Sequence, residues 1–129
     1  MELEKIKIIV VDDNKFMAQS IVNAIRSIGI KNIFVANDGY SAINIAIKEI
    51  PHLIFLDIIM PGIDGFETLR RLKSKEQLKN TFVIVTTGND DIKSVSEAIK
   101  LGANKYILKT EVAAYIKNKL IDLLSELVQ

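Results

Sequence analysis

The chain has 129 residues and no cysteine, and its 17 Lys and Arg residues nearly balance its 16 Asp and Glu residues. This length suits one domain with a single core, and the near-neutral charge without a basic block argues against direct binding to nucleic acid. Because the start of the chain lacks a signal-peptide pattern and no apolar run reaches membrane-spanning length, we expect a cytoplasmic protein without membrane insertion.

Five short apolar runs, rich in β-branched residues, predict buried strands. In chain order they cover Lys7–Val11, Asn32–Ala36, Leu53–Asp57, Phe82–Thr87 and residues 105–109. Apolar residues at helical spacing follow each run, which predicts one amphipathic helix after each strand. For the second and the last helix, this spacing places the following residues on the inward face: Ile43, Ala46, Ile47 and Ile50, and then Ala113, Ile116, Leu120, Leu123 and Leu127.

Five strand-then-helix units in succession predict an α/β fold, with a doubly wound parallel sheet and helices on both faces. Right-handed crossovers leave few topologies, and the strand order 2-1-3-4-5 puts the first and third strands side by side. In sheets of this kind, ligands bind at the carboxyl ends of the strands. The residues that follow each strand are therefore the candidates for a functional site.

Acidic residues stand at the ends of the first and third strands. Asp12 and Asp13 follow the first strand directly, and Asp57 is the last residue of the third. If these strands are neighbours, three carboxylates crowd together, which raises their pKa values or requires a cation. A hard divalent ion, Mg²⁺ or Mn²⁺, would bind there through oxygen ligands. Taken singly, Asp57 also suits an ordinary turn, and Asp12 and Asp13 suit a solvated helix cap, where Asp13 or Asn14 is the expected N-cap.

Two other strand ends carry side chains that suit phosphoryl chemistry. A carboxylate beside Mg²⁺ can attack phosphorus and form an aspartyl phosphate, which makes Asp57 the candidate nucleophile. Lys109, at the end of the fifth strand, can place its ammonium against a phosphoryl group, and Thr87, at the end of the fourth, can donate a hydroxyl to it. Alone, each would be an ordinary solvated lysine or strand threonine, so the prediction depends on their joint placement.

Four features together resemble the response-regulator receiver domains of the CheY-like superfamily. They are the acidic pair after the first strand, the pattern Asp-x-x-Met-Pro-Gly-x-Asp-Gly from Asp57 to Gly65, Thr87 before the small Gly88, and the pattern Gly-Ala-x-x-Tyr-x-x-Lys that ends at Lys109. A joint match of this kind is specific, and it covers essentially the whole chain. The resemblance implies the flavodoxin-like (βα)5 fold, as a single domain.

The resemblance further implies that residues 1–129 form one receiver domain of a two-component system, with Asp57 as the phosphoacceptor. Asp13 and Asp57 would bind Mg²⁺ directly, together with the backbone carbonyl of Ile59, while Asp12 would act mainly through water. Mn²⁺ would fit the same ligands.

The family pattern also implies a switch pair, Thr87 and Tyr106. The Thr hydroxyl would move toward the phosphoryl group, and the Tyr ring would turn inward behind it. Lys109 would pair with the phosphoryl oxygens. Thr86 competes for the threonine role, but Thr87 is the one that directly precedes a small residue, as the family pattern requires.

Two positions tune the loss of the phosphoryl group in this family, and here they hold Ile59 and Asn89. One departure concerns Lys109, which most relatives follow with a proline in a cis bond, whereas this chain has Thr110. Because a cis bond to a non-proline residue costs roughly 3–4 kcal/mol, we expect this peptide to be trans or only conditionally cis, with a reshaped entry to the last helix. The loop looks short, since Glu111 can already begin the last helix.

Function and partners follow from the same resemblance. A histidine kinase or phosphotransfer protein would phosphorylate the chain, whose only catalysis would be Mg²⁺-assisted self-phosphorylation and self-dephosphorylation, so it would not be an enzyme in the usual sense. Output would pass to a downstream protein through the surface formed by the fourth helix, fifth strand and fifth helix. A chemotaxis regulator, a phosphorelay intermediate and a receiver excised from a larger regulator or hybrid kinase all fit, as a monomer or weak dimer.

Two alternatives differ in chemistry. The first is a degenerate receiver-like interaction module that never takes up phosphate. The second is a phosphatase of the haloacid dehalogenase type, which resembles this chain in its strand-end Asp nucleophile. Those enzymes carry a second Asp two residues later, where this chain has Ile59, and this position excludes them.

Overall fold

Strands and helices alternate along the chain in the computed structural model, which describes residues 1–60, 62–88 and 92–128. The strands are β1 (Lys7–Val11), β2 (Asn32–Ala36), β3 (Leu53–Asp57), β4 (Phe82–Thr87) and β5 (Lys105–Leu108). The helices are α1 (Lys15–Ser27), α2 (Gly39–Glu49), α3 (Gly65–Ser74), α4 (Ile92–Lys100) and α5 (Val112–Leu127). Short 3₁₀ turns lie at Leu3–Lys5, Glu76–Leu78 and Lys109–Glu111.

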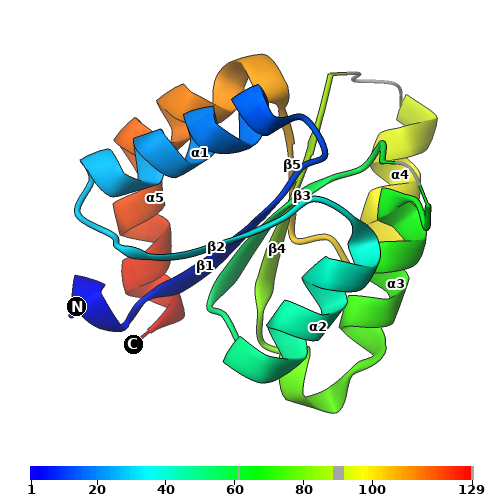
Figure 1. Cartoon of the computed structure of the whole chain (residues 1–129), viewed down its shortest axis with the longest axis horizontal. Helices are drawn as coiled ribbons and strands as arrows, with labels where there is room; N and C mark the ends of the chain where they lie inside the picture. Colours follow the sequence, from blue (N-terminus) through cyan, green and yellow to red (C-terminus); the bar gives the residue numbers. More distant parts are fainter. Residues whose placement is uncertain (61, 89–91, 129) are drawn as a thin grey trace.

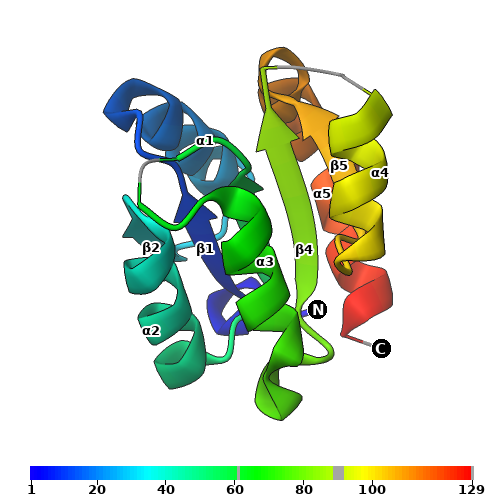
Figure 2. The same cartoon turned by 90° about the vertical axis from the view of Figure 1, so that its right-hand side faces the viewer.

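The sheet is parallel throughout, and its strand order β2-β1-β3-β4-β5 confirms the predicted topology. Helices α1 and α5 cover one face, and α2, α3 and α4 cover the other (Figure 1). Figure 2 shows the arrowheads of β1 and β4 pointing to the same edge of the sheet. Since β1 pairs directly with β3, the residues that end these two strands are neighbours at that edge.

Both faces of the sheet are buried, because each strand sends alternate side chains into opposite helical layers. This explains why the strands are almost continuously apolar. We call the layer under α1 and α5 the α1–α5 core; it includes Ile8, Val10, Ile21, Ile25, Phe55, Ile84, Ile107, Ile116 and Leu120. The α2–α4 core lies on the opposite face and includes Ile9, Val11, Ala42, Ala46, Ile54, Leu56, Leu69, Val83, Val85 and Ala98.

Side-chain caps fix where three helices begin. Asn14 Oδ1 accepts from the Met17 N–H at 3.0 Å, so Asn14 rather than Asp13 is the N-cap of α1. Asp38 and Asp64 cap α2 and α3 in the same way, each with an oxygen 2.8 Å from the capped backbone nitrogen. Among the described residues, no helix combines the length and the apolar character that crossing a membrane requires.

Four details differ from the sequence-based expectation: the inward face of α2, the buried stripe of α5, the end of β5 and the start of α5. In α2 the inward face is centred on Ala42, Ile43 and Ala46, so Ile47 is partly exposed; Ile50 lies past the helix end as a left-handed C-cap with φ 47° and is also exposed. The reason is that α2 packs on the sheet through the face that carries Ala42 and Ala46.

In α5 the buried stripe is Val112, Ile116, Leu120 and Leu124, and Ala113 is exposed. The strand β5 ends one residue early, at Leu108, because Lys109 already belongs to the 3₁₀ turn that leads into α5. Glu111 closes that turn, and the α-helix proper begins at Val112, one residue later than expected.

Gly65, the first residue of α3, lies against the backbone that follows β3. A Cβ at this position would lie 2.3 Å from Ile58 Cα and 2.6 Å from the Asp57 carbonyl oxygen. The Gly65 N–H also donates to the Ile58 carbonyl oxygen at 3.0 Å. This close approach holds the backbone after Asp57 against the start of α3.

We therefore expect Gly65→Ala to lower the free energy of unfolding by about 2–4 kcal/mol, because backbone atoms have to move to admit the methyl group. Denaturant unfolding measures this effect. Gly88→Ala is the matched control, since no heavy atom of the described residues lies within 4 Å of a Cβ there, and its stability should stay within about 0.5 kcal/mol of the wild type. Equal stability of both variants would contradict the close approach at Gly65.

Candidate functional site

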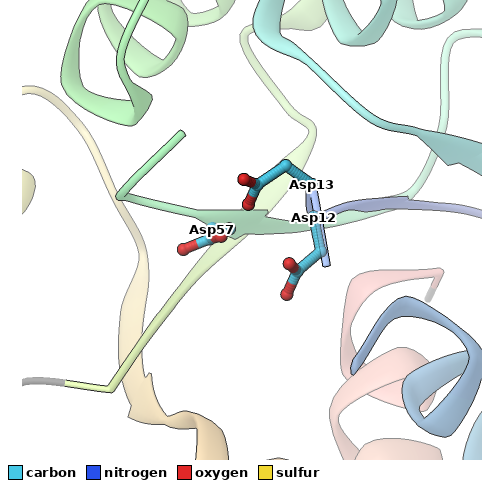
Figure 3. Close-up of side chains that lie close together, drawn as sticks. All are labelled: Asp12, Asp13 and Asp57. Atoms are coloured by element: carbon cyan, nitrogen blue, oxygen red, sulfur yellow. The ribbon is translucent and has the colours of Figure 1, made fainter. Parts of the chain in front are cut away.

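Three carboxylates converge where β1 and β3 end. One oxygen from each of Asp12, Asp13 and Asp57 lies within 4.8 Å of the others, and Figure 3 shows the three side chains gathered around one point. Asp12 and Asp57 are 0% and 1% exposed, whereas Asp13 is exposed to solvent. The structure thus brings together the acidic residues that the sequence places at neighbouring strand ends.

Lys109 joins this cluster from the other side of β4. Its Nζ lies 3.1 Å from Asp57 Oδ2 and 3.2 Å from Asp12 Oδ2. Burial lowers the pKa of the Lys109 ammonium, but the charges of Asp57 and Asp12 outweigh that effect and leave the pKa above its usual value. The Lys109–Thr110 peptide is trans, as predicted, and the trans bond leaves Lys109 in reach of both carboxylates.

Each oxygen of Asp57 accepts one hydrogen bond. Its Oδ1 accepts from the Ile59 N–H at 3.1 Å, and its Oδ2 accepts from Lys109 Nζ. Burial raises the pKa of Asp57 from 3.8 to about 6; the Ile59 N–H opposes this rise, the charge of Asp12 adds to it, and Lys109 opposes it. At neutral pH the carboxylate is therefore ionised in surroundings that disfavour its charge.

The cluster fits a hard divalent cation. Asp12 Oδ1 accepts from the Asn14 N–H at 2.9 Å, but the buried Asp12 Oδ2 has no hydrogen-bond donor among the described residues beyond its ionic contact with Lys109. An incompletely satisfied buried oxygen that faces two further carboxylates is a ligand set suited to Mg²⁺ or Mn²⁺. The Ile59 N–H bond to Asp57 also keeps the backbone of Ile59, the implied carbonyl ligand, beside the cluster.

The two threonines at the end of β4 fall on opposite sides of the sheet. Ile84 belongs to the α1–α5 core and Val85 to the α2–α4 core, so alternation places Thr86 on the first side and Thr87 on the second. Both are buried. Tyr106 of β5, half-buried, packs against the α2–α4 core, so it shares the side of Thr87.

Sequence reasoning treated Thr86 only as a rival of Thr87. The structure adds that Thr86 is in register with Asp57, the residue at the centre of the acidic cluster. The signal that could have shown this was the period-two alternation, counted from Asp57 across a predicted register. Two positions were predicted to tune the loss of the phosphoryl group. Ile59 is 66% exposed, two residues after Asp57, and Asn89 lies outside the described residues.

A surface cavity of about 610 Å³ lies over α4, β5 and α5. Its lining includes Val95, Tyr106, Leu108, Ala114, Tyr115 and Lys119. Tyr106 therefore lines the cavity while it packs on the side of the sheet that holds Thr87. This residue connects the α2–α4 core to the outer surface.

Comparison with known proteins places this site in context. The family model for the response regulator receiver domain matches residues 8–121 of the chain. The chain is 32% identical to the chemotaxis protein CheY-3 of Vibrio cholerae, over 91% of this chain and 90% of that protein. It is also 32% identical to the chemotaxis protein CheY of Pseudomonas aeruginosa, over 88% and 92% of the two chains.

A solved structure agrees with these matches. The crystal structure of the phosphorylated cyanobacterial phytochrome response regulator RcpA superposes with a TM-score of 0.83 at 26% identity, and the alignment covers 93% of this chain and 94% of that one.

The raised pKa of Asp57 predicts a pH-dependent effect on stability. Because this pKa, about 6, lies above the usual 3.8, the folded protein binds the proton more tightly than the unfolded chain does. The stabilisation is complete below pH 3.8 and is lost as the pH rises through about 6. We expect Asp57→Asn, which removes the buried charge, to raise the free energy of unfolding by about 1–3 kcal/mol at pH 7.5, and this gain to be mostly absent near pH 4.

Denaturant unfolding at the two pH values measures this prediction, in buffer without divalent ions. Asp122→Asn, on the exposed side of α5, is the control and should leave stability unchanged at both. An Asp57→Asn protein less stable than the wild type at pH 7.5 would show that the ion pair with Lys109 outweighs the burial of Asp57.

Proposed function

This chain belongs to the response regulator receiver domain family, and from that premise we propose that it is a phosphorylation-controlled switch with Asp57 as its phosphoacceptor. The observation that carries the proposal is the buried Asp57 carboxylate, which contacts Lys109 and shares its edge of the sheet with Asp12 and Asp13. Such a carboxylate can act as a nucleophile, and the charged groups around it are already in place before the reaction. The phosphorylated form of the structural relative RcpA supports the same chemistry here.

In the proposed reaction, an Asp57 carboxylate oxygen attacks the phosphorus of a phosphohistidine on a kinase or phosphotransfer protein. The new bond is O–P, the P–N bond breaks, and the imidazole of the donor leaves with the bonding electron pair. The Lys109 ammonium is 3.1 Å from Asp57 Oδ2. It can therefore move its hydrogen bond from the carboxylate to the phosphoryl oxygens as they take up the negative charge. The hydroxyl of Thr87 donates a second hydrogen bond to the phosphoryl group.

Asp12, Asp13, Asp57 and the Ile59 carbonyl would hold the Mg²⁺ or Mn²⁺ ion. When bound, this ion neutralises charge on the phosphoryl oxygens in the transition state. The residues themselves keep the carboxylate oriented: the Ile59 N–H holds Asp57 Oδ1, and the Asn14 N–H holds Asp12 Oδ1. Both carboxylates are thus fixed by backbone donors of the loops that follow their strands.

A downstream protein would bind at the surface around the cavity over α4, β5 and α5. Thr87 and Tyr106 lie on adjacent strands on the same side of the sheet, and Tyr106 lines the cavity. A hydroxyl drawn toward the phosphoryl group makes room for the Tyr106 ring to turn inward, which changes the surface offered to a downstream protein. The chemotaxis proteins among its relatives fit an output of this kind, by protein contact.

Phosphorylation by a small donor tests the chemistry directly. With Mg²⁺ and acetyl phosphate, the wild type should gain the mass of one phosphoryl group, and acetate leaves as the P–O bond of the donor breaks. Asp57→Asn should gain nothing, and a chelator should abolish the gain in the wild type. Intact-mass spectrometry measures both. No gain in the wild type, with no binding of beryllofluoride either, would favour the receiver-like interaction module instead.

The exposed Ile59 side chain should slow the loss of the phosphoryl group. Dephosphorylation needs a water oxygen to attack phosphorus while the bond to the Asp57 oxygen breaks, and a branched apolar group beside the site hinders that water. We expect Ile59→Asn to dephosphorylate several-fold faster than the wild type, and Ile59→Leu to decay like the wild type. The decay of phosphorylated protein after removal of the donor is the measurement, and equal rates for Ile59→Asn and the wild type would refute the expectation.

A further inference from the structure

Thr86 is a buried polar residue that the proposed mechanism does not use. Its side chain is 1% exposed, and its Oγ1 has no hydrogen-bond partner among the described residues. By contrast, the hydroxyl of the buried Thr81 donates to the Pro51 carbonyl oxygen at 2.8 Å. A buried hydroxyl without a partner destabilises the state in which it occurs, and such a group calls for a physical explanation.

The position of Thr86 points to the acidic cluster. Thr86 is in register with Asp57 on one side and with Ile107 on the other. Alternation places it on the face of the α1–α5 core, together with Phe55 and Asp57 of β3. The β4 residue next to Asp57, on the same face of the sheet, is therefore Thr86 and not Thr87.

The Lys109 side chain crosses the strand that carries Thr86. It follows β5, yet its Nζ contacts Asp57 at the end of β3 and Asp12 after β1. The strand order places β4 between β5 and β3, so the Lys109 side chain crosses the carboxyl end of β4. Asp12 and Asp57 share one face of the sheet, and Thr86 is the last β4 residue that alternation places on that face.

The ammonium of Lys109 has three N–H donors and no acceptor. In the structure described here, its contacts are the carboxylate oxygens of Asp57 and Asp12. Phosphorylation turns one Asp57 oxygen into the bridging oxygen of an acyl phosphate, and a cation in the cluster would compete for the carboxylates. One of the three N–H donors can then bond to another acceptor, and the strand that Lys109 crosses carries the Thr86 hydroxyl.

We propose that Thr86 is a positioning residue for Lys109, whose ammonium donates to Thr86 Oγ1 when the phosphoryl group and cation occupy the site. The inference rests on the proposed function and deepens it. It explains why a hydroxyl that lacks a partner in the resting protein is placed there: its partner, the Lys109 ammonium, turns to it only when the phosphoryl group occupies the site. Thr86 thus favours the occupied state at the expense of the resting one.

Two substitutions separate this role from simple packing. Thr86→Val keeps the shape and removes the hydroxyl, so it should raise the thermal unfolding midpoint of the resting protein while it weakens the affinity for beryllofluoride with Mg²⁺ by about tenfold. Thr86→Ser keeps the hydroxyl and removes a methyl group, so it should lower the midpoint while affinity stays within about twofold of the wild type. A packing role would move midpoint and affinity in the same direction in each variant.

A double-mutant cycle assigns the effect to Lys109. In a Lys109→Met background, Thr86→Val should cause no further loss of beryllofluoride affinity, because the donor is absent. Thr81→Val is the matched control: it should lower the unfolding midpoint, since it leaves the Pro51 carbonyl without its partner, and leave affinity unchanged.

The outcomes distinguish the two levels of the proposal. A wild type that binds beryllofluoride, together with a Thr86→Val variant that binds it equally well, overturns the role of Thr86 and leaves the proposed function intact. The same loss in the presence and absence of Lys109 also overturns it. A wild type that binds no beryllofluoride removes the proposed function, and the role of Thr86 with it.

Discussion

The contact of Lys109 with Asp57 and Asp12 is the interaction on which the arrangement of the site depends. It joins residues 52 positions apart in the chain, at 3.1 Å, across an intervening strand. Only a parallel sheet in which β1 and β3 are adjacent brings two buried carboxylates within reach of one lysine. The order β2-β1-β3-β4-β5 is thus a condition for the chemistry as well as a description of the fold. Burial gives the contact its strength, since charges in a low-dielectric interior interact far more strongly than in water.

Because side chains alternate along β4, Thr86 and Thr87 lie on opposite faces of the sheet and have different neighbours. Thr86 lies on the face that carries Asp12 and Asp57, where the phosphoryl group would be made and held. Thr87 lies on the face where Tyr106 packs against the α2–α4 core and lines the outer cavity, but as the last residue of β4 it also stands at the edge of the sheet that carries Asp57. A reaction on one face could therefore change the packing on the other face, because two consecutive residues of β4 point to opposite sides of the sheet. This division follows from the period of the strand and needs no separate device.

Much of this arrangement could be predicted from the sequence, because it depends on local patterns. The strands from Lys7 to Thr87 have the predicted bounds, and the strand order followed from right-handed crossovers. The exposure of Ile47 was not predictable in this way, since helical spacing admits two neighbouring faces and the packing of Ala42 against the sheet selects one. The side of the sheet on which Thr86 lies was missed for a similar reason: it depends on strand register, which is a long-range property.

A phosphoryl group at Asp57 is small, yet it would have to change the surface around the cavity over α4, β5 and α5. Shifting a two-state equilibrium from 1:99 to 99:1 requires a preference of about 5.5 kcal/mol for one state. A hydrogen bond to a charged group contributes roughly 1.5–3 kcal/mol, so about two to four such bonds made only in the phosphorylated state suffice. Lys109 is well placed to convert them into motion, because it stands in the turn between β5 and α5, and both of these elements line the cavity. When its ammonium leaves the two carboxylates for the phosphoryl oxygens, the backbone that carries it connects directly to the surface a partner would meet.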